Sequence, residues 1–250
     1  MEIEYIISRT LSISIDIFAV LTAIFAVLLV HKLWKKPVSN IKGILVKVFS
    51  SLAIGSILFA VAEIWWEIVV LSGSDPALGT AEIFWIAGIL FFILGYGYFT
   101  FYMYKEHQKT GKGIILTGAA TIIAGSIVYF LITNYIFGYQ SGETTYEIFL
   151  DYFYPITSAI ILVLVIAVFM FFKDIGNIGK PLLLLAIGST FSFLADMLYT
   201  YYSWNEIYGI PGILSDSFYS TDYLLSAVAF YMLWRMGMKK LSKNEKGDNK

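Results

Sequence analysis

The chain has 250 residues, of which 58% are hydrophobic and 14% are charged, and its formal net charge at pH 7 is −1. Soluble domains average about 45–50% apolar and about 25% charged residues, so this composition excludes an ordinary soluble domain and predicts an integral membrane protein. The sequence contains no cysteine, which excludes disulfides, iron–sulfur clusters, thiolate zinc sites and cysteine catalysis.

Seven apolar stretches are long enough to cross a bilayer. A hydrocarbon core about 30 Å thick needs roughly 20 residues of α-helix, because each residue adds about 1.5 Å. The predicted spans are residues 11–30, 44–71, 83–104, 114–137, 152–172, 181–203 and 218–236. The longest linkers, 138–150 and 204–217, are rich in turn-forming residues. We therefore expect an all-α domain of seven transmembrane helices over residues 1–237 and a basic cytoplasmic tail over residues 238–250.

Lysine and arginine lie almost entirely on one side of these spans. Of the 17 such residues, all except Arg9 follow the first, third, fifth or seventh span. Positively charged residues in short loops stay in the cytoplasm, so we expect a multi-pass protein of the cell membrane with its N-terminus outside and its C-terminus inside. Because most acids fall on the outer side, the net charge of −1 is the sum of two opposite charge layers.

One part of the sequence is repeated. The segment Ala53-Ile54-Gly55-Ser56 recurs as Ala186-Ile187-Gly188-Ser189. Continuing this alignment, with one residue inserted in the linker, pairs acids with acids and aromatics with aromatics: Glu63 with Asp196, Trp66 with Tyr199, Glu82 with Asp216, and Trp85 with Tyr219. Spans two and three therefore echo spans six and seven in the same direction. This predicts a parallel repeat of three plus one plus three helices, with the fourth as connector.

The second copy carries acids and aromatics on both sides of a Gly/Pro turn. An acid is followed three residues later by an aromatic, then by the turn, a second acid and an aromatic-rich helix: Asp196, Tyr199, Gly209, Pro211, Asp216, Tyr219 and Tyr223. This pattern resembles the seven-helix membrane sensor module that precedes effector domains in some bacterial and archaeal histidine kinases and diguanylate cyclases. The resemblance implies a sensor. Since no effector domain follows the last span, we expect the signal to pass to a separate protein partner.

Other cofactor and catalytic signals are missing from the sequence. The topology resembles that of rhodopsins, but span 218–236 contains no lysine that could form a retinal Schiff base, so no retinal is expected. No HExxH, GxSxG or glycine-rich phosphate loop occurs, and we therefore expect no enzyme. Nothing in the sequence predicts a nucleic-acid partner. Whether the protein binds a cation is left open by the sequence.

Five acids fall inside the predicted spans, and three more fall at their outer rim. The five are Asp16, Glu63, Glu67, Asp196 and Asp222, and the three are Glu82, Asp151 and Asp216. Counted at about 1.5 Å per residue, the five lie about 6–12 Å below the outer boundary, in one layer. No span contributes a lysine or arginine at that depth, so these carboxylates would be protonated, hydrated in a vestibule, or occupied by an external cation.

These acids predict a ligand-binding or cation-binding site that opens to the outside, and Trp66 and Tyr199 are candidates for the walls of an aromatic cage around an organic cation. An alternative interpretation is that the acids reach the headgroups and the aromatics form an interface belt. Three functions stay open. They are a receptor or sensor for a cationic or polar small ligand, a cation-coupled or proton-coupled transporter that uses Glu63 and Asp196, and a structural subunit of a membrane complex.

Overall fold

The computed structural model describes residues 2–35, 40–73, 79–106, 111–136, 144–173, 178–204 and 210–236. Every element in these ranges is helical: α1 Glu2–Trp34, α2 Asn40–Leu71, α3 Thr80–Glu106, α4 Gly111–Leu131, the π-helical turn η1 Ile132–Ile136, α5 Thr145–Phe172, α6 Gly179–Trp204 and α7 Ile210–Met236. The described part of the chain is therefore all-α, as the composition predicts. Gly209 and the predicted basic tail at 238–250 lie outside the described residues.

Among the described residues, six helices, α1 to α6, are long and apolar enough to cross a membrane. This confirms the prediction of a multi-pass helical membrane protein that contacts a lipid bilayer. The predicted seventh span, 218–236, lies in α7, which is not one of these six. The reason is in its sequence, since Asp216, Asp222 and several serines lower its hydropathy.

Three helices begin well before the apolar runs that predicted them. Helix α1 begins at Glu2, α5 at Thr145 and α7 at Ile210, so the prediction that residues 145–150 and 210–217 belong to loops is wrong. At α5 the cause is local, because Thr144 and Glu147 form a capping box in which the Glu147 amide donates to Thr144 Oγ1 at 3.3 Å. Pro211, predicted in a turn, lies in the first turn of α7, where its missing N–H is no loss.

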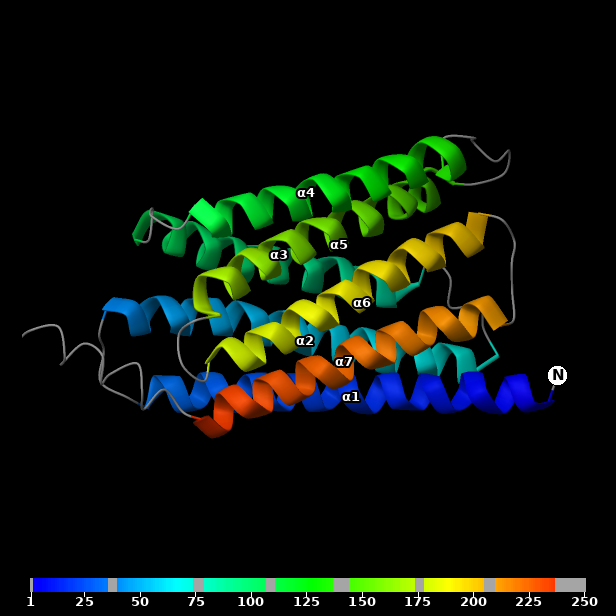
Figure 1. Ribbon diagram of the computed structural model, residues 1–250. Coiled ribbons are helices and arrows are strands. Elements are labelled where there is room, and N and C mark those ends of the chain that lie inside the picture. The colour runs from blue at the N-terminus through cyan, green and yellow to red at the C-terminus, as the bar shows by residue number, and fades with distance from the viewer. Residues whose placement is uncertain are drawn as a thin grey trace, which may run out of the picture.

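Six of the helices form a closed ring. Each packs against the next in the order α1, α2, α3, α5, α6 and α7, and α7 packs against α1. Helix α4 packs mainly against α5, and Figure 1 shows it at the outer edge of the bundle. The ring consists of two sets of three consecutive helices, α1–α3 and α5–α7. The last helix of each set packs against the first helix of the other, α3 against α5 and α7 against α1.

The largest apolar core fills one end of this ring. It lies where α1 ends and α2 begins, around Leu29, Leu33, Val48, Leu52 and Phe230, each at most 2% exposed. Tight packing in this half leaves the opposite half of the ring, where α1, α3, α5 and α7 begin, as the place for a cavity.

Candidate functional site

A cavity of about 620 Å³ lies inside the ring. All six ring helices contribute side chains to its wall, and among the described residues α4 contributes none. Cavities of about 300–1,000 Å³ are typical of small-molecule sites in proteins. The cavity is therefore large enough for a small organic ligand, and the core at the inner end closes it on the side of the predicted cytoplasm.

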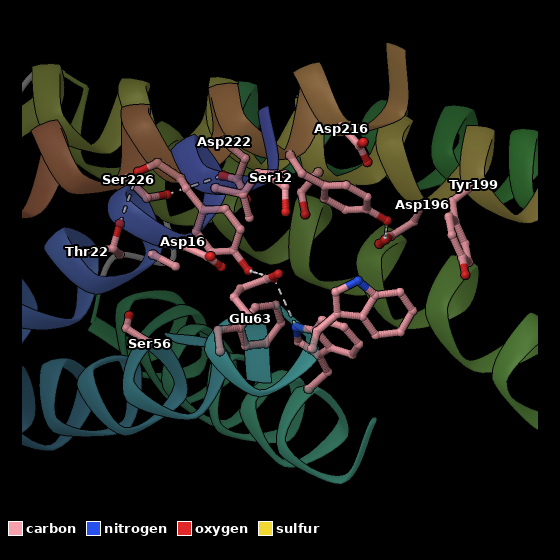
Figure 2. A pocket seen from close by; sticks show the side chains of 18 of the residues that line it. Ser12, Asp16, Thr22, Ser56, Glu63, Asp196, Tyr199, Asp216, Asp222 and Ser226 are labelled. Carbon is pink, nitrogen blue, oxygen red and sulfur yellow. Dashed lines mark hydrogen bonds between the residues drawn. The ribbon is translucent and has the colours of Figure 1, made fainter. Parts of the chain in front are cut away.

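All nine residues predicted for the site line this one cavity. They come from five helices and are Asp16, Glu63, Trp66, Glu67, Glu82, Asp196, Tyr199, Asp216 and Asp222. Figure 2 shows Glu63 between two groups, with Asp16 and Asp222 on one side and Asp196, Asp216 and Tyr199 on the other. Their shared position favours a common cavity over the alternative of separate contacts with lipid headgroups.

Glu63 of α2 is held by two aromatic side chains. Its Oε1 accepts a hydrogen bond from the Tyr223 hydroxyl at 2.6 Å and another from Trp85 Nε1 at 3.1 Å. Tyr223 belongs to α7, so this contact joins the two halves of the ring across the cavity. Donors of this kind replace the water that a carboxylate loses when it is buried.

Asp196 of α6 is held in the same way. Its Oδ1 accepts a hydrogen bond from the Tyr219 hydroxyl at 2.5 Å. Asp196 aligns with Glu63 in the sequence repeat, and Tyr219 aligns with Trp85. At each of these two aligned positions an acid therefore accepts a hydrogen bond from an aromatic side chain at the aligned position of the following helix.

The correspondence extends along the wall of the cavity. On α2 and α6 the lining residues that align are Ser56 with Ser189, Phe59 with Ser192, Glu63 with Asp196, and Trp66 with Tyr199. On α3 and α7 they are Glu82 with Asp216, Trp85 with Tyr219, Ile89 with Tyr223, Phe92 with Ser226, and Tyr96 with Phe230. The alignment predicted from the sequence thus pairs positions that face one cavity, although several of the side chains differ.

The prediction that no base reaches the acidic layer is wrong for Glu67. Arg9 forms an ion pair with Glu67, and the Ser12 hydroxyl donates to Glu67 Oε2 at 2.8 Å. The error arose because α1 begins at Glu2, which places Arg9 in the helix, two turns before Asp16. Glu67 is therefore neutralised within the protein by a direct ion pair.

Glu82 was predicted at the rim but is buried, with 8% of its surface exposed. It accepts a hydrogen bond from the Tyr154 hydroxyl of α5. Sequence reasoning missed this side of the site, since Tyr154, Ser158 and Ile161 carry no charge and lie outside the repeated segments. Their spacing of four and three residues is the one signal that places them on a common helical face.

Asp222 of α7 lies directly against α6. A Cβ atom added to Gly188 would stand 2.6 Å from Asp222 Oδ1, so only glycine leaves room for this carboxylate. Ser226 donates to Asp222 Oδ1 at 3.3 Å. The described residues contain no group of three or more His, Cys, Asp or Glu side chains that could hold a metal ion.

The charges of the wall are unbalanced. Among the described residues that line the cavity, seven are acids and Arg9 is the single base. Carboxylates confined in a low-dielectric cavity attract cations, because opposite charge offsets part of their lost hydration.

Comparison with known proteins adds no assignment: no protein-family model matches the chain, and neither a curated protein nor a solved structure is significantly similar to it.

Proposed function

We propose that the chain is a receptor-like membrane protein that binds a small organic cation in the acidic cavity and signals to a separate protein partner. The observation that carries this proposal is the excess of carboxylates over bases around one cavity. A positively charged ligand would be attracted into such a cavity, whereas an anion would be repelled.

Aromatic side chains make an organic cation a better candidate than a bare metal ion for the main part of the cavity. Trp66, Trp85, Tyr199 and Tyr219 all line it, and Trp66 and Trp85 lie with their ring centroids 5.4 Å apart. Aromatic faces attract alkylammonium groups through their quadrupole. A ligand with a quaternary or primary ammonium group therefore fits both the charge and the walls.

The orientation in the membrane belongs to the same proposal. We take α7 as a seventh transmembrane helix, since its polar residues Asp216, Asp222 and Ser226 face the cavity instead of lipid. The lysine-rich ends of the helices would face the cytoplasm and the cavity would open outside. Occupancy would then be transmitted through α2, α3, α6 and α7, which the Tyr223 contact with Glu63 links across the ring.

Choline is a suitable probe for the first test. Choline chloride, titrated into the detergent-purified chain at constant ionic strength, should raise its unfolding temperature, because a ligand that binds the folded state alone stabilises it. At ten times the dissociation constant we expect a rise of about 3–5 °C. The uncharged isostere 3,3-dimethyl-1-butanol should produce no rise.

Matched variants show whether the choline-dependent rise in unfolding temperature arises from the cavity. Glu63→Gln and Asp196→Asn should each weaken the choline response at least about tenfold, since each removes one carboxylate from the wall. Glu147→Gln removes an acid that does not line the cavity and keeps a side chain that suits a capping box, so it should respond as the native chain does. An equal response to the uncharged isostere would contradict the proposal.

A second candidate function is transport of the cation coupled to protons or sodium. The observation that favours it is the pair of repeat-related acids, Glu63 and Asp196, which face one cavity and accept hydrogen bonds from repeat-related donors. Parallel repeats of this kind occur in secondary transporters. Proteoliposomes with an imposed proton or sodium gradient should then accumulate choline, and Glu63→Gln or Asp196→Asn should abolish the uptake. Binding without uptake favours the receptor.

A further inference from the structure

The inner end of the cavity differs in chemistry from the rest. We call this part the inner chamber and define it by the side chains of Tyr96, Ser192, Asp222 and Ser226 together with the backbone of Gly188. Figure 2 shows Asp222 and Ser226 near Thr22, away from Asp196 and Tyr199. The chamber therefore stands apart from the aromatic walls proposed for the organic cation.

Asp222 is positioned as a ligand in this chamber. The Ser226 hydroxyl donates to its Oδ1 at 3.3 Å, and the Ser192 hydroxyl of α6 interacts with the same carboxylate. The absence of a side chain at Gly188 lets the carboxylate lie against the backbone of α6, where a Cβ would come within 2.6 Å of Oδ1. The α6–α7 contact thus holds one carboxylate and two hydroxyl oxygens close together.

The Tyr96 side chain of α3 is a second observation, independent of Asp222, that favours a polar ligand in this chamber. Its side chain lines the cavity and is 5% exposed, and within the described parts of the chain its hydroxyl has no hydrogen-bond partner. It is also close enough to Asp222 for an electrostatic interaction. A buried hydroxyl without a partner is costly and uncommon, and a bound water or ion is the usual explanation.

We propose that the inner chamber binds a compact monovalent metal cation, Na⁺, through the carboxylate of Asp222 and the hydroxyl oxygens of Tyr96, Ser192 and Ser226. Hard cations prefer such oxygen ligands. One carboxylate neutralises one positive charge, whereas a divalent ion would leave a net charge inside the membrane. The inference deepens the proposed function and rests on it only in treating the cavity as a site for cations.

The test is a sodium titration of the detergent-purified full chain at constant ionic strength. Replacing N-methyl-D-glucamine chloride by NaCl should raise the unfolding temperature by about 3–5 °C when Na⁺ reaches ten times its dissociation constant. Asp222→Asn should abolish this shift, and Tyr96→Phe and Ser226→Ala should each raise the half-saturating Na⁺ concentration several-fold. Asp196→Asn removes the same charge from the same cavity and should keep the shift.

Three results of the sodium titration would overturn the inner cation site. Equal effects of NaCl and N-methyl-D-glucamine chloride, or equal losses in Asp222→Asn and Asp196→Asn, would mean general screening and overturn the proposal. A shift with methylammonium but not with Na⁺ would overturn it too and assign the chamber to the ammonium group of an organic ligand. If Asp222→Asn does not fold, Tyr96→Phe and Ser226→Ala decide by their half-saturating concentrations.

The sodium and choline experiments can each contradict one proposal without contradicting the other. Choline is titrated at one fixed Na⁺ concentration, so a choline response that persists while Na⁺ has no effect overturns the inner cation site alone. A Na⁺ response without any choline response overturns the receptor proposal and leaves the inner cation site standing.

Discussion

At the scale of single residues, the cavity depends on aromatic donors that face acids. Glu63, Glu82 and Asp196 each accept a hydrogen bond from a tyrosine hydroxyl, supplied by Tyr223, Tyr154 and Tyr219 respectively. Every one of these pairs joins two different helices. The hydrogen bonds therefore keep the acids inside the ring and at the same time link helices to each other, two of the pairs between neighbouring helices and the Tyr223–Glu63 pair across the cavity.

The substitution Tyr219→Phe tests this role. It keeps the ring and removes the hydroxyl that donates to Asp196 Oδ1. Loss of a donor to a buried acceptor costs about 1–3 kcal/mol, so the unfolding temperature should fall by several degrees.

The matched control is Tyr129→Phe on α4, where the side chain is 70% exposed. It should change the stability by less than about 0.5 kcal/mol. Equal stability of the two variants would mean that the hydrogen bond between Tyr219 and Asp196 contributes nothing.

At the scale of the helices, glycine residues allow the close packing of two helix pairs, α2 with α3 and α6 with α7. Helices α2 and α3 come together at Gly55 and Gly88, where a Cβ on either residue would stand within about 3.2 Å of the carbonyl oxygen of the other. Helices α6 and α7 come together at Gly188 and Asp222, which align with those two glycines in the repeat. Small residues at such crossings let membrane helices pack closely.

The substitution Gly88→Ala should weaken the α2–α3 pair. The new Cβ would lie 2.4 Å from the Phe59 ring and 3.2 Å from the Gly55 carbonyl oxygen, so both the ring and the backbone would have to move. Overpacking of this kind costs about 1–3 kcal/mol, which thermal unfolding in detergent would measure.

Gly125→Ala on α4 is the control for that experiment. Its Cβ would meet nothing within 4 Å, and alanine favours helix by up to about 1 kcal/mol, so this variant should be as stable as the native chain or slightly more stable. A Gly88→Ala variant of native stability would contradict the close crossing of α2 and α3.

At the scale of the whole molecule, the ring divides into an apolar end and an acidic end. The core around Leu33 and Val48 closes one end, and the cavity with its seven acids occupies the other. Charges gathered in a cleft can produce potentials of several kT, so under the proposed function we expect this cavity to attract cations before any specific contact is made.

Thiol labelling measures that potential directly, since the chain has no cysteine of its own. Ser189→Cys places a thiol in the cavity wall, and Thr80→Cys places one on an exposed position outside the cavity at the same end of the bundle. A cationic methanethiosulfonate should react faster than an anionic one at position 189, by a ratio at least about tenfold greater than at position 80. Equal ratios at both positions would show that the wall is electrically neutral.

The helices and the candidate site were predictable from the sequence to different degrees. The apolar runs located the seven α-helices of the described residues, because an apolar run of about 20 residues is long enough to form a bilayer-crossing helix. They misplaced the starts of α1 and α7, since polar residues such as Arg9 and Asp216 face the cavity and break the apolar pattern without ending the helix. They also misplaced the start of α5, which is set by a polar capping box. All nine residues predicted for the site line the same cavity. The acids could be named from the sequence because acids in or beside an apolar span are costly and therefore stand out, whereas Trp66 and Tyr199 were named from their alignment with each other.

What the sequence by itself determined is a set of membrane helices with an acidic layer at one end, since hydropathy and charge are properties of the chain read in order. Only the tertiary structure decided which groups meet. It pairs Arg9 with Glu67, brings Tyr154 of α5 to Glu82, and leaves the buried hydroxyl of Tyr96 near Asp222 without a hydrogen-bond partner among the described residues. Such contacts join residues of different helices that are far apart in the sequence, so the packing of the helices into a ring decides them and no local pattern predicts them.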